Sequence, residues 1–150
     1  MQMENLINEQ LITLELKAGE KKAAIEELSG LLMENGCITN TKTFVQDVLT
    51  RESLSTTGIG FGVAIPHARS MSVNRPALAF GRSGAGINWN SLDGQPVHMV
   101  FLIAVPAESA ENEHLKILSA LSRKLIHEDF RRRLEEAPDE SQVVATLTGN

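Results

Sequence analysis

The residue with the clearest chemical potential in this sequence is His67, which lies in the segment GIGFGVAIPHARS at residues 58–70. Its three alternating glycines can adopt backbone conformations that are closed to other residues, while Pro66 fixes its own φ and holds Ile65 extended. The pattern predicts that a stiff strand end delivers the imidazole into a tight setting of small residues. Such an imidazole could serve as a metal ligand, a general base or a nucleophile.

The glycines of this segment match neither of the common nucleotide-binding loops. No lysine follows Gly62, as the phosphate-binding P-loop would require, and Val63 stands where the dinucleotide fingerprint needs its third glycine. The sequence therefore predicts no nucleotide site, and we expect the protein to work without a cofactor.

Metal binding and general-base catalysis find little support in the other residues. A zinc site needs further ligands at regular spacing, and His98, His114 and His127 form no HxxxH or HExxH pattern. A general base needs a nucleophile to activate, and Ser53 and Ser55 lie nearby without a GxSxG elbow. Both hypotheses stay open, but they have less support than a nucleophilic role for His67.

A nucleophilic histidine fits the charged residues that could gather around it. Arg51 and Arg69 could neutralise an anion, and the glycine N–H groups could bind one. His114 begins a predicted helix whose free N–H groups and dipole favour a bound phosphate. A neutral imidazole accepts a phosphoryl group directly, so these residues together favour phosphoryl transfer through His67.

His114 also has a purely structural interpretation. It shares a helix face with a row of leucines, and this spacing alone favours a buried core histidine over a functional one: Leu118, Leu121 and Leu125. His98 alternates within a predicted strand and His127 sits at a helix junction, so we expect structural roles for both.

Composition predicts one globular domain over residues 1–150. The chain has the length of a single domain, and its 42% of apolar residues suffices for a sizeable core. The net charge of −5 argues against a nucleic-acid partner. Neither a signal peptide nor a membrane-spanning stretch is evident, so we expect a cytoplasmic protein without membrane insertion. The single cysteine, Cys37, follows a helix-ending glycine and reads as a small buried residue.

Hydrophobic spacing predicts alternating strands and helices. Short strands are expected at residues 10–16, 76–83 and 96–106, the last of them central in its sheet because it is nearly all apolar. Helices are expected at residues 20–35, 41–52, 113–125, 129–137 and 139–147. This order predicts an α/β (α+β) fold, with one mixed sheet covered by helices on both faces.

Five segments together resemble a known family. They are RES at residues 51–53, TGIGFGVAIPHA at 57–68, GINW at 86–89, DGQPVHMVFLIAVPAE at 93–108 and EHLKILSALSRKL at 113–125. The chain is similar to the IIA domain of the fructose and mannitol class of the bacterial phosphoenolpyruvate-dependent sugar phosphotransferase system (PTS). The likeness spans nearly the whole chain, and its two histidine motifs occur in the family's order.

The resemblance implies a fold and a set of roles. It implies a mixed sheet of about five strands between helices. It also implies that His67 accepts a phosphoryl group from the phosphohistidine of the carrier protein HPr and passes it to a cysteine of a IIB domain or protein of a sugar permease. His114 would stabilise the phosphohistidine, whereas its spacing relative to the leucines favoured a buried core residue. Arg51 would contact the phosphate. Sugar specificity would lie in the membrane component.

Two departures and two alternatives accompany the resemblance. Phe61 stands where many members carry a polar residue, which would alter the rim of the site. Cys37 does not resemble the cysteine loop of IIB, so we expect the chain either to act on separate partner proteins or to be one domain of a larger protein. The alternatives to a fructose-type transport carrier are a nitrogen-type regulatory IIA protein, which signals through its phosphorylation state, and a serine hydrolase that uses His67 as its base.

Overall fold

Strand β6 (Val97–Pro106) lies at the centre of the sheet, because nearly all of its side chains are apolar and buried. It pairs antiparallel with β5 (Ala77–Ile87) on one side and parallel with β3 (Val63–Ala64) and β4 (His67–Ser70) on the other. The central position predicted for this strand is confirmed. The computed structural model describes residues 3–109 and 112–149, so residues 1, 2, 110, 111 and 150 of the expected domain lie outside the described residues.

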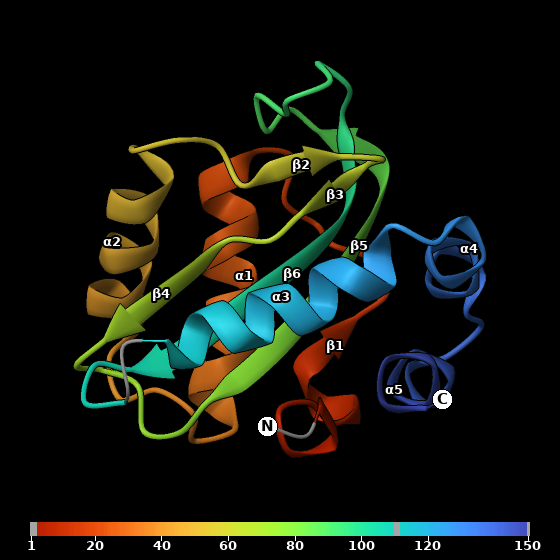
Figure 1. The fold of residues 1–150 in the computed structure, drawn as a ribbon. Helices are drawn as coiled ribbons and strands as arrows, with labels where there is room; N and C mark the ends of the chain where they lie inside the picture. Colours follow the sequence, from red (N-terminus) through yellow and green to blue (C-terminus); the bar gives the residue numbers. More distant parts are fainter. Residues whose placement is uncertain (1–2, 110–111, 150) are drawn as a thin grey trace.

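Within the described residues, six strands form one mixed sheet in the order β1, β5, β6, β3, β2, with β4 also paired to β6 (Figure 1). The family resemblance implied about five strands. The additional strand arises because β3 (Val63–Ala64) and β4 (His67–Ser70) pair with the same strand, β6, but are counted separately. Pro66 lies between them and has no N–H to donate, so it interrupts the pairing. The predicted α/β class with a mixed sheet is confirmed.

The first strand is much shorter than its sequence predicted. The side chain of Asn8 accepts a hydrogen bond from the N–H of Gln10 and caps a 3-10 turn, η2 (Glu9–Leu11). This local side-chain bond takes Gln10 and Leu11 out of the extended conformation, and the chain bends at residues 14 and 15. Only β1 (Ile12–Thr13) remains, parallel to β5 (Ala77–Ile87) at the edge of the sheet.

The alternating glycines form a tight turn between two short antiparallel strands. β2 (Gly58–Gly60) folds back onto β3, and the three residues at the turn all have positive φ: Gly60 at 102°, Phe61 at 60° and Gly62 at 75°. Glycine adopts such angles without the steric cost that a side chain brings. The turn therefore directs the chain into β3, so that the first residue of β4 is His67.

Helices cover both faces of the sheet, as predicted (Figure 1). The helices α1 (Lys21–Glu34) and α2 (Thr41–Glu52) lie on one face, and α3 (Glu113–Leu125) crosses the other. α2 begins where the side chain of Asn40 accepts the N–H of Thr43, so Asn40 is its N-cap.

The chain ends in two short helices beside the N-terminal segment. α4 (Glu128–Glu136) and α5 (Glu140–Thr148) are separated at Pro138, as the sequence predicted, and the side chain of Asp139 caps α5 by accepting the N–H of Gln142. Figure 1 shows α5 next to the N-terminal turns, η1 (Met3–Asn5) and η2.

One hydrophobic core fills the space between the sheet and the helices, and its largest fully buried members are Trp89, Phe44, Phe80 and Phe101. Cys37 is completely buried next to the positive-φ Gly36, which confirms the prediction of a small buried residue.

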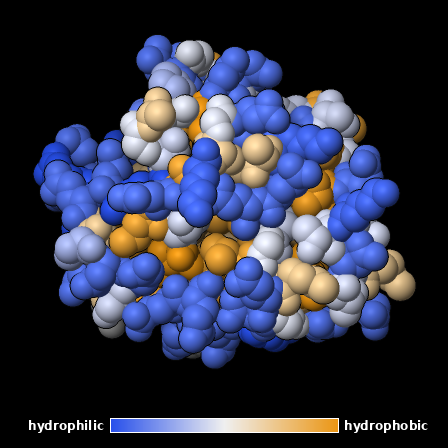
Figure 2. Space-filling view, turned by 180° about the vertical axis from the view of Figure 1, so that it is seen from behind, coloured by the Kyte–Doolittle hydropathy of each residue, from blue (hydrophilic) through white to orange (hydrophobic). Residues whose placement is uncertain are grey.

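The surface is mainly polar on the side of the molecule that faces away from the viewer in Figure 1. Figure 2 shows polar residues over most of this side. Among residues 3–109 and 112–149, no helix has the length and apolar character needed to cross a bilayer.

Arg82 joins the sheet to the C-terminal helices. Its Nη1 donates hydrogen bonds to the carbonyl oxygens of Leu134, Glu135 and Ala137, at 3.0, 3.1 and 2.9 Å, where α4 ends. Because hydrogen bonds from charged donors stabilise more than neutral ones, we expect Arg82→Met to lower the free energy of unfolding by about 2 kcal/mol in urea titrations. Arg75→Met is the matched control, since Arg75 donates a single bond, to the Asn35 carbonyl. An equal loss in both variants would contradict the prediction.

Candidate functional site

The imidazole of His67 is held in one orientation by its own strand. Only 7% of the residue's surface is exposed, and Nδ1 of the ring lies 2.9 Å from the carbonyl oxygen of Ile65. A carbonyl can only accept a hydrogen bond, so Nδ1 carries the hydrogen and Nε2 keeps its lone pair. The structure therefore presents Nε2 as the nucleophilic nitrogen of this ring.

A hollow of about 460 Å³ brings the three predicted site residues together. His67 enters it from β4, Arg51 from the last turn of α2 and His114 from the first turn of α3. The remaining lining residues are Asp47, Thr50, Leu54, Ala68 and Arg69. Residues far apart in the sequence thus share one site, because α2, β4 and α3 meet there.

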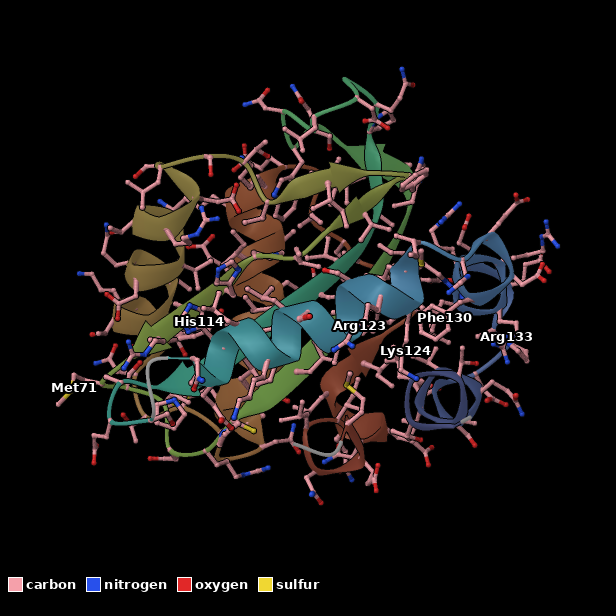
Figure 3. All side chains as sticks on the ribbon, viewed as in Figure 1. Met71, His114, Arg123, Lys124, Phe130 and Arg133 are labelled. Atoms are coloured by element: carbon pink, nitrogen blue, oxygen red, sulfur yellow. The ribbon has the colours of Figure 1, made fainter. Side chains whose placement is uncertain are left out.

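The two histidines face each other across this hollow. Their ring centroids are 6.0 Å apart and their planes are inclined by 25°. Figure 3 shows His114 at the start of α3. His114 is half-buried and lines the hollow, which differs from the core position that leucine spacing alone favoured. The ring of His114 instead stacks with that of His67, the first residue of β4.

Arg51 contributes a fixed positive charge. Its Nη1 donates a hydrogen bond of 3.0 Å to the carbonyl oxygen of Ser55, which ties the side chain to the loop after α2. A half-buried guanidinium at the wall of a hollow attracts anions, and its planar N–H groups match phosphate oxygens. Arg51 therefore suits the predicted phosphate contact.

Arg69 has a second task that the sequence did not reveal. Its Nη2 donates to the carbonyl oxygens of Ala107 and Ser109, at 2.9 and 3.0 Å, while the side chain also lines the hollow. These bonds connect β4 to the segment that follows β6 and precedes His114 in the sequence. No local pattern could have indicated this contact, because its partners are 38 and 40 positions away.

The alternatives considered from sequence receive no geometric support. The hydroxyl of Ser53 donates to the carbonyl of Thr50, Ser55 lies against Arg51, and neither serine lines the hollow of His67. In residues 3–109 and 112–149, no three His, Cys, Asp or Glu side chains are grouped so that they could hold a metal ion.

The other sequence candidates lie away from the hollow. His98 bonds through Nδ1 to the carbonyl of Ser83, at 2.9 Å, and His127 is the exposed residue before α4. Phe61, which was expected at the rim of the site, is instead exposed on the β2–β3 turn and stacks with Arg131, whose guanidinium carbon lies 4.3 Å from the ring centroid. The rim is therefore built by other residues.

Burial lowers the pKa of His67 below its ordinary value of 6.5, and the positive charges of Arg51 and His114 lower it further. The Ile65 carbonyl and the carboxylate of Glu52 act in the opposite direction and offset part of this shift. The net result is a ring that is neutral at pH 7, with its Nε2 lone pair available.

The lowered pKa predicts a titration that NMR can follow. We expect the ring protons of His67 to titrate with a midpoint below 6.5 in the folded protein and near 6.5 in urea. Because the folded state binds the proton less readily than the unfolded state, this group's contribution to stability is present above pH 6.5 and is lost as the pH falls. A titration midpoint at or above 6.5 for His67 in the folded protein would show that the pKa of this ring is not lowered.

Comparisons with known proteins identify the family of this chain. Residues 5–150 match the family described as "Phosphoenolpyruvate-dependent sugar phosphotransferase system, EIIA 2". The chain is 43% identical over 138 residues to the PTS system fructose-specific EIIA component of Haloferax volcanii, which covers 92% of this chain and 89% of the relative. It is also 43% identical to the fructose-specific EIIABC component of Bacillus subtilis, covering 96% of this chain and 22% of that longer protein.

Solved structures define the same class by shape. The nitrogen regulatory protein IIA-Ntr of Neisseria meningitidis superposes with a TM-score of 0.89 at 34% identity, over 97% of this chain and 98% of that one. Enzyme IIA-Mtl of Escherichia coli, in its complex with phosphorylated enzyme IIB-Mtl, shares the fold with a TM-score of 0.81 at 24% identity, over 96% and 98% of the two chains. The fold is thus that of a PTS IIA protein. The chain belongs to the EIIA 2 family of the phosphoenolpyruvate-dependent sugar phosphotransferase system.

Proposed function

We propose that this protein is a cytoplasmic phosphoryl carrier for sugar uptake of the fructose type. In this proposal Nε2 of His67 takes a phosphoryl group from the phosphohistidine of HPr and passes it to a cysteine of a IIB domain or protein. The observation that carries the proposal is the bond from Nδ1 to Ile65, since it leaves Nε2 as the nucleophile in a hollow that Arg51 and His114 also line.

The transfer step needs no proton movement at His67. The Nε2 lone pair forms the new bond to phosphorus while the donor's nitrogen–phosphorus bond breaks and leaves its electron pair on the donor ring. The proton on Nδ1 stays in place, so the His67 ring becomes positively charged, and the Ile65 carbonyl stabilises that charge. Arg51 and His114 would stabilise the charge on the transferring oxygens.

Exposed apolar side chains beside the hollow suit brief docking with two partners in turn. Leu54 lines the hollow and is 78% exposed, and Leu115 follows His114 with 56% exposed. A carrier must release each partner quickly, so we expect interfaces at or below about 1,200 Å² in total. Fructose as the substrate class rests on the relatives in Haloferax volcanii and Bacillus subtilis.

A regulatory function is the second candidate, and the similarity to IIA-Ntr of Neisseria meningitidis favours it. Incubation with phosphoenolpyruvate, enzyme I and HPr, followed by addition of a fructose-type IIB protein, separates the two. We expect an acid-labile phosphate on His67 that moves to the IIB cysteine. A label that stays on His67 would favour regulation, whereas a protein without any phosphohistidine would overturn both candidates.

A further inference from the structure

A buried carboxylate lies next to the site but outside its lining. Glu52 is the last residue of α2, and only 5% of its side chain is exposed. Its Oε2 accepts a charged bond of 3.2 Å from Nζ of Lys21, at the start of α1. Burying a carboxylate costs free energy unless it is paired and hydrogen-bonded, so we examined which groups satisfy Glu52 and what they connect it to.

Thr57 connects this carboxylate to the sheet. Its N–H donates to Oε2 of Glu52 at 3.2 Å, and its hydroxyl is hydrogen-bonded to Oε1. The same hydroxyl lies 3.2 Å from Nε1 of the fully buried Trp89. Because an indole N–H can only donate, the hydroxyl accepts from Trp89 and gives its hydrogen to Glu52. The direction of every bond in this network is therefore determined.

Two backbone hydrogen bonds lead from Thr57 to the imidazole. The carbonyl oxygen of Thr57 accepts the N–H of Ile65 at 3.0 Å, and the carbonyl oxygen of Ile65 accepts the Nδ1 hydrogen of His67 at 2.9 Å. Pro66, between these two residues, limits the rotation of the connection. Figure 1 places the start of α1, the end of α2 and β2 at the same end of the molecule, where this network lies.

We propose that Glu52 is a positioning residue for phosphoryl transfer, because it holds Thr57 and Ile65 so that the imidazole of His67 keeps its proton on Nδ1 and presents Nε2. This inference rests on the proposed carrier function of His67. The carboxylate has a second effect, since its negative charge stabilises the positive charge that the ring acquires when the nitrogen–phosphorus bond forms. In agreement with this, Glu52 raises the pKa of His67, whereas Arg51 and His114 lower it.

The test compares Glu52→Gln with Glu27→Gln. Glutamine keeps the shape of the side chain and removes its charge. Glu27 is a matched control, because its half-buried carboxylate also accepts backbone N–H groups, from Lys17 and Ala18, yet has no link to His67. We expect Glu52→Gln to slow labelling by phospho-HPr at least tenfold and to shift the equilibrium about tenfold toward phospho-HPr, with Glu27→Gln within twofold of wild type.

A second pair of variants guards against a folding defect in Glu52→Gln. Thr57→Ser keeps the hydroxyl and should transfer at nearly the wild-type rate, whereas Thr57→Val removes it and should resemble Glu52→Gln. Nitrogen-15 NMR of the unphosphorylated proteins reports the tautomer of His67 independently of any transfer. We expect a single Nδ1–H tautomer in wild type and Thr57→Ser, and a mixture of tautomers with a lower titration midpoint in Glu52→Gln.

The outcomes separate this inference from the carrier function. A wild-type protein that never becomes labelled at His67 refutes the carrier function, while the NMR measurement still decides whether Glu52 sets the tautomer. Wild-type rate, equilibrium and tautomer in Glu52→Gln would overturn the positioning role. Equal losses in Glu52→Gln and Glu27→Gln, in step with melting temperature, would overturn it as well.

Discussion

Replacing His67 by glutamine is expected to abolish phosphoryl acceptance from HPr. The amide has about the size of the imidazole, so the hollow keeps its shape, but no nitrogen with a basic lone pair remains to attack phosphorus. Loss of a nucleophile removes its step entirely, and we expect labelling to fall by at least about a thousandfold, as losses of other enzymic nucleophiles do. The measurement is transfer of radioactive phosphate from phosphoenolpyruvate through enzyme I and HPr.

The control for this variant is His127→Gln. His127 is exposed before α4 and outside the hollow, so its loss should leave labelling unchanged. Labelling that persists in His67→Gln, or a label that resists acid as a serine ester does, would contradict the assignment of the nucleophile.

Replacing His114 by alanine is expected to have the second largest effect, on rate rather than on labelling. The attacking nitrogen of His67 remains, so the phosphohistidine still forms. The loss of one charge-assisted hydrogen bond costs about 1.5 to 3 kcal/mol, which slows onward transfer to IIB by about one to two orders of magnitude if the bond acts in the transition state. Rapid-quench measurement of transfer to the IIB cysteine tests this.

A change in folding must be separated from this effect, because removal of a half-buried ring can leave a cavity. His114→Gln keeps an N–H donor with a similar volume and should recover part of the rate, whereas alanine should not. Equal melting temperatures with unaltered transfer in His114→Ala would show that this histidine takes no part. A phosphate mapped to His114 would exchange the roles of the two residues.

Local pattern in the sequence was enough for most of the framework. The helical spacing at residues 21–34 and 113–125, the side-chain cap at Asn40 and the apolar run of β6 each depend on neighbours within a few positions. The local rule failed at residues 10 and 11, where a hydrogen bond from the N–H of Gln10 to the side chain of Asn8 favoured a 3-10 turn over a strand.

Three residues that line the hollow could also be named from the sequence, while their roles stay predictions. The glycine turn and Pro66 pointed to His67, and the resemblance of short motifs to the EIIA 2 family pointed to Arg51 and His114. Spacing alone favoured the core for His114, because periodicity tells which face of a helix is apolar but does not tell which residues of the sheet lie against that face.

Tertiary structure alone decided how these residues are held. The bonds from Arg69 to Ala107 and Ser109, and from Trp89 to Thr57, join positions more than thirty residues apart. Glu52 and Thr57 are close in sequence, but their connection to the imidazole passes through a backbone bond to Ile65 that exists only once β2 and β3 have folded. The sequence determined which groups can do chemistry, because that depends on residue type and local conformation. The packing of α1, α2 and the sheet decided their protonation and orientation, because burial and long-range hydrogen bonds arise only in the folded chain.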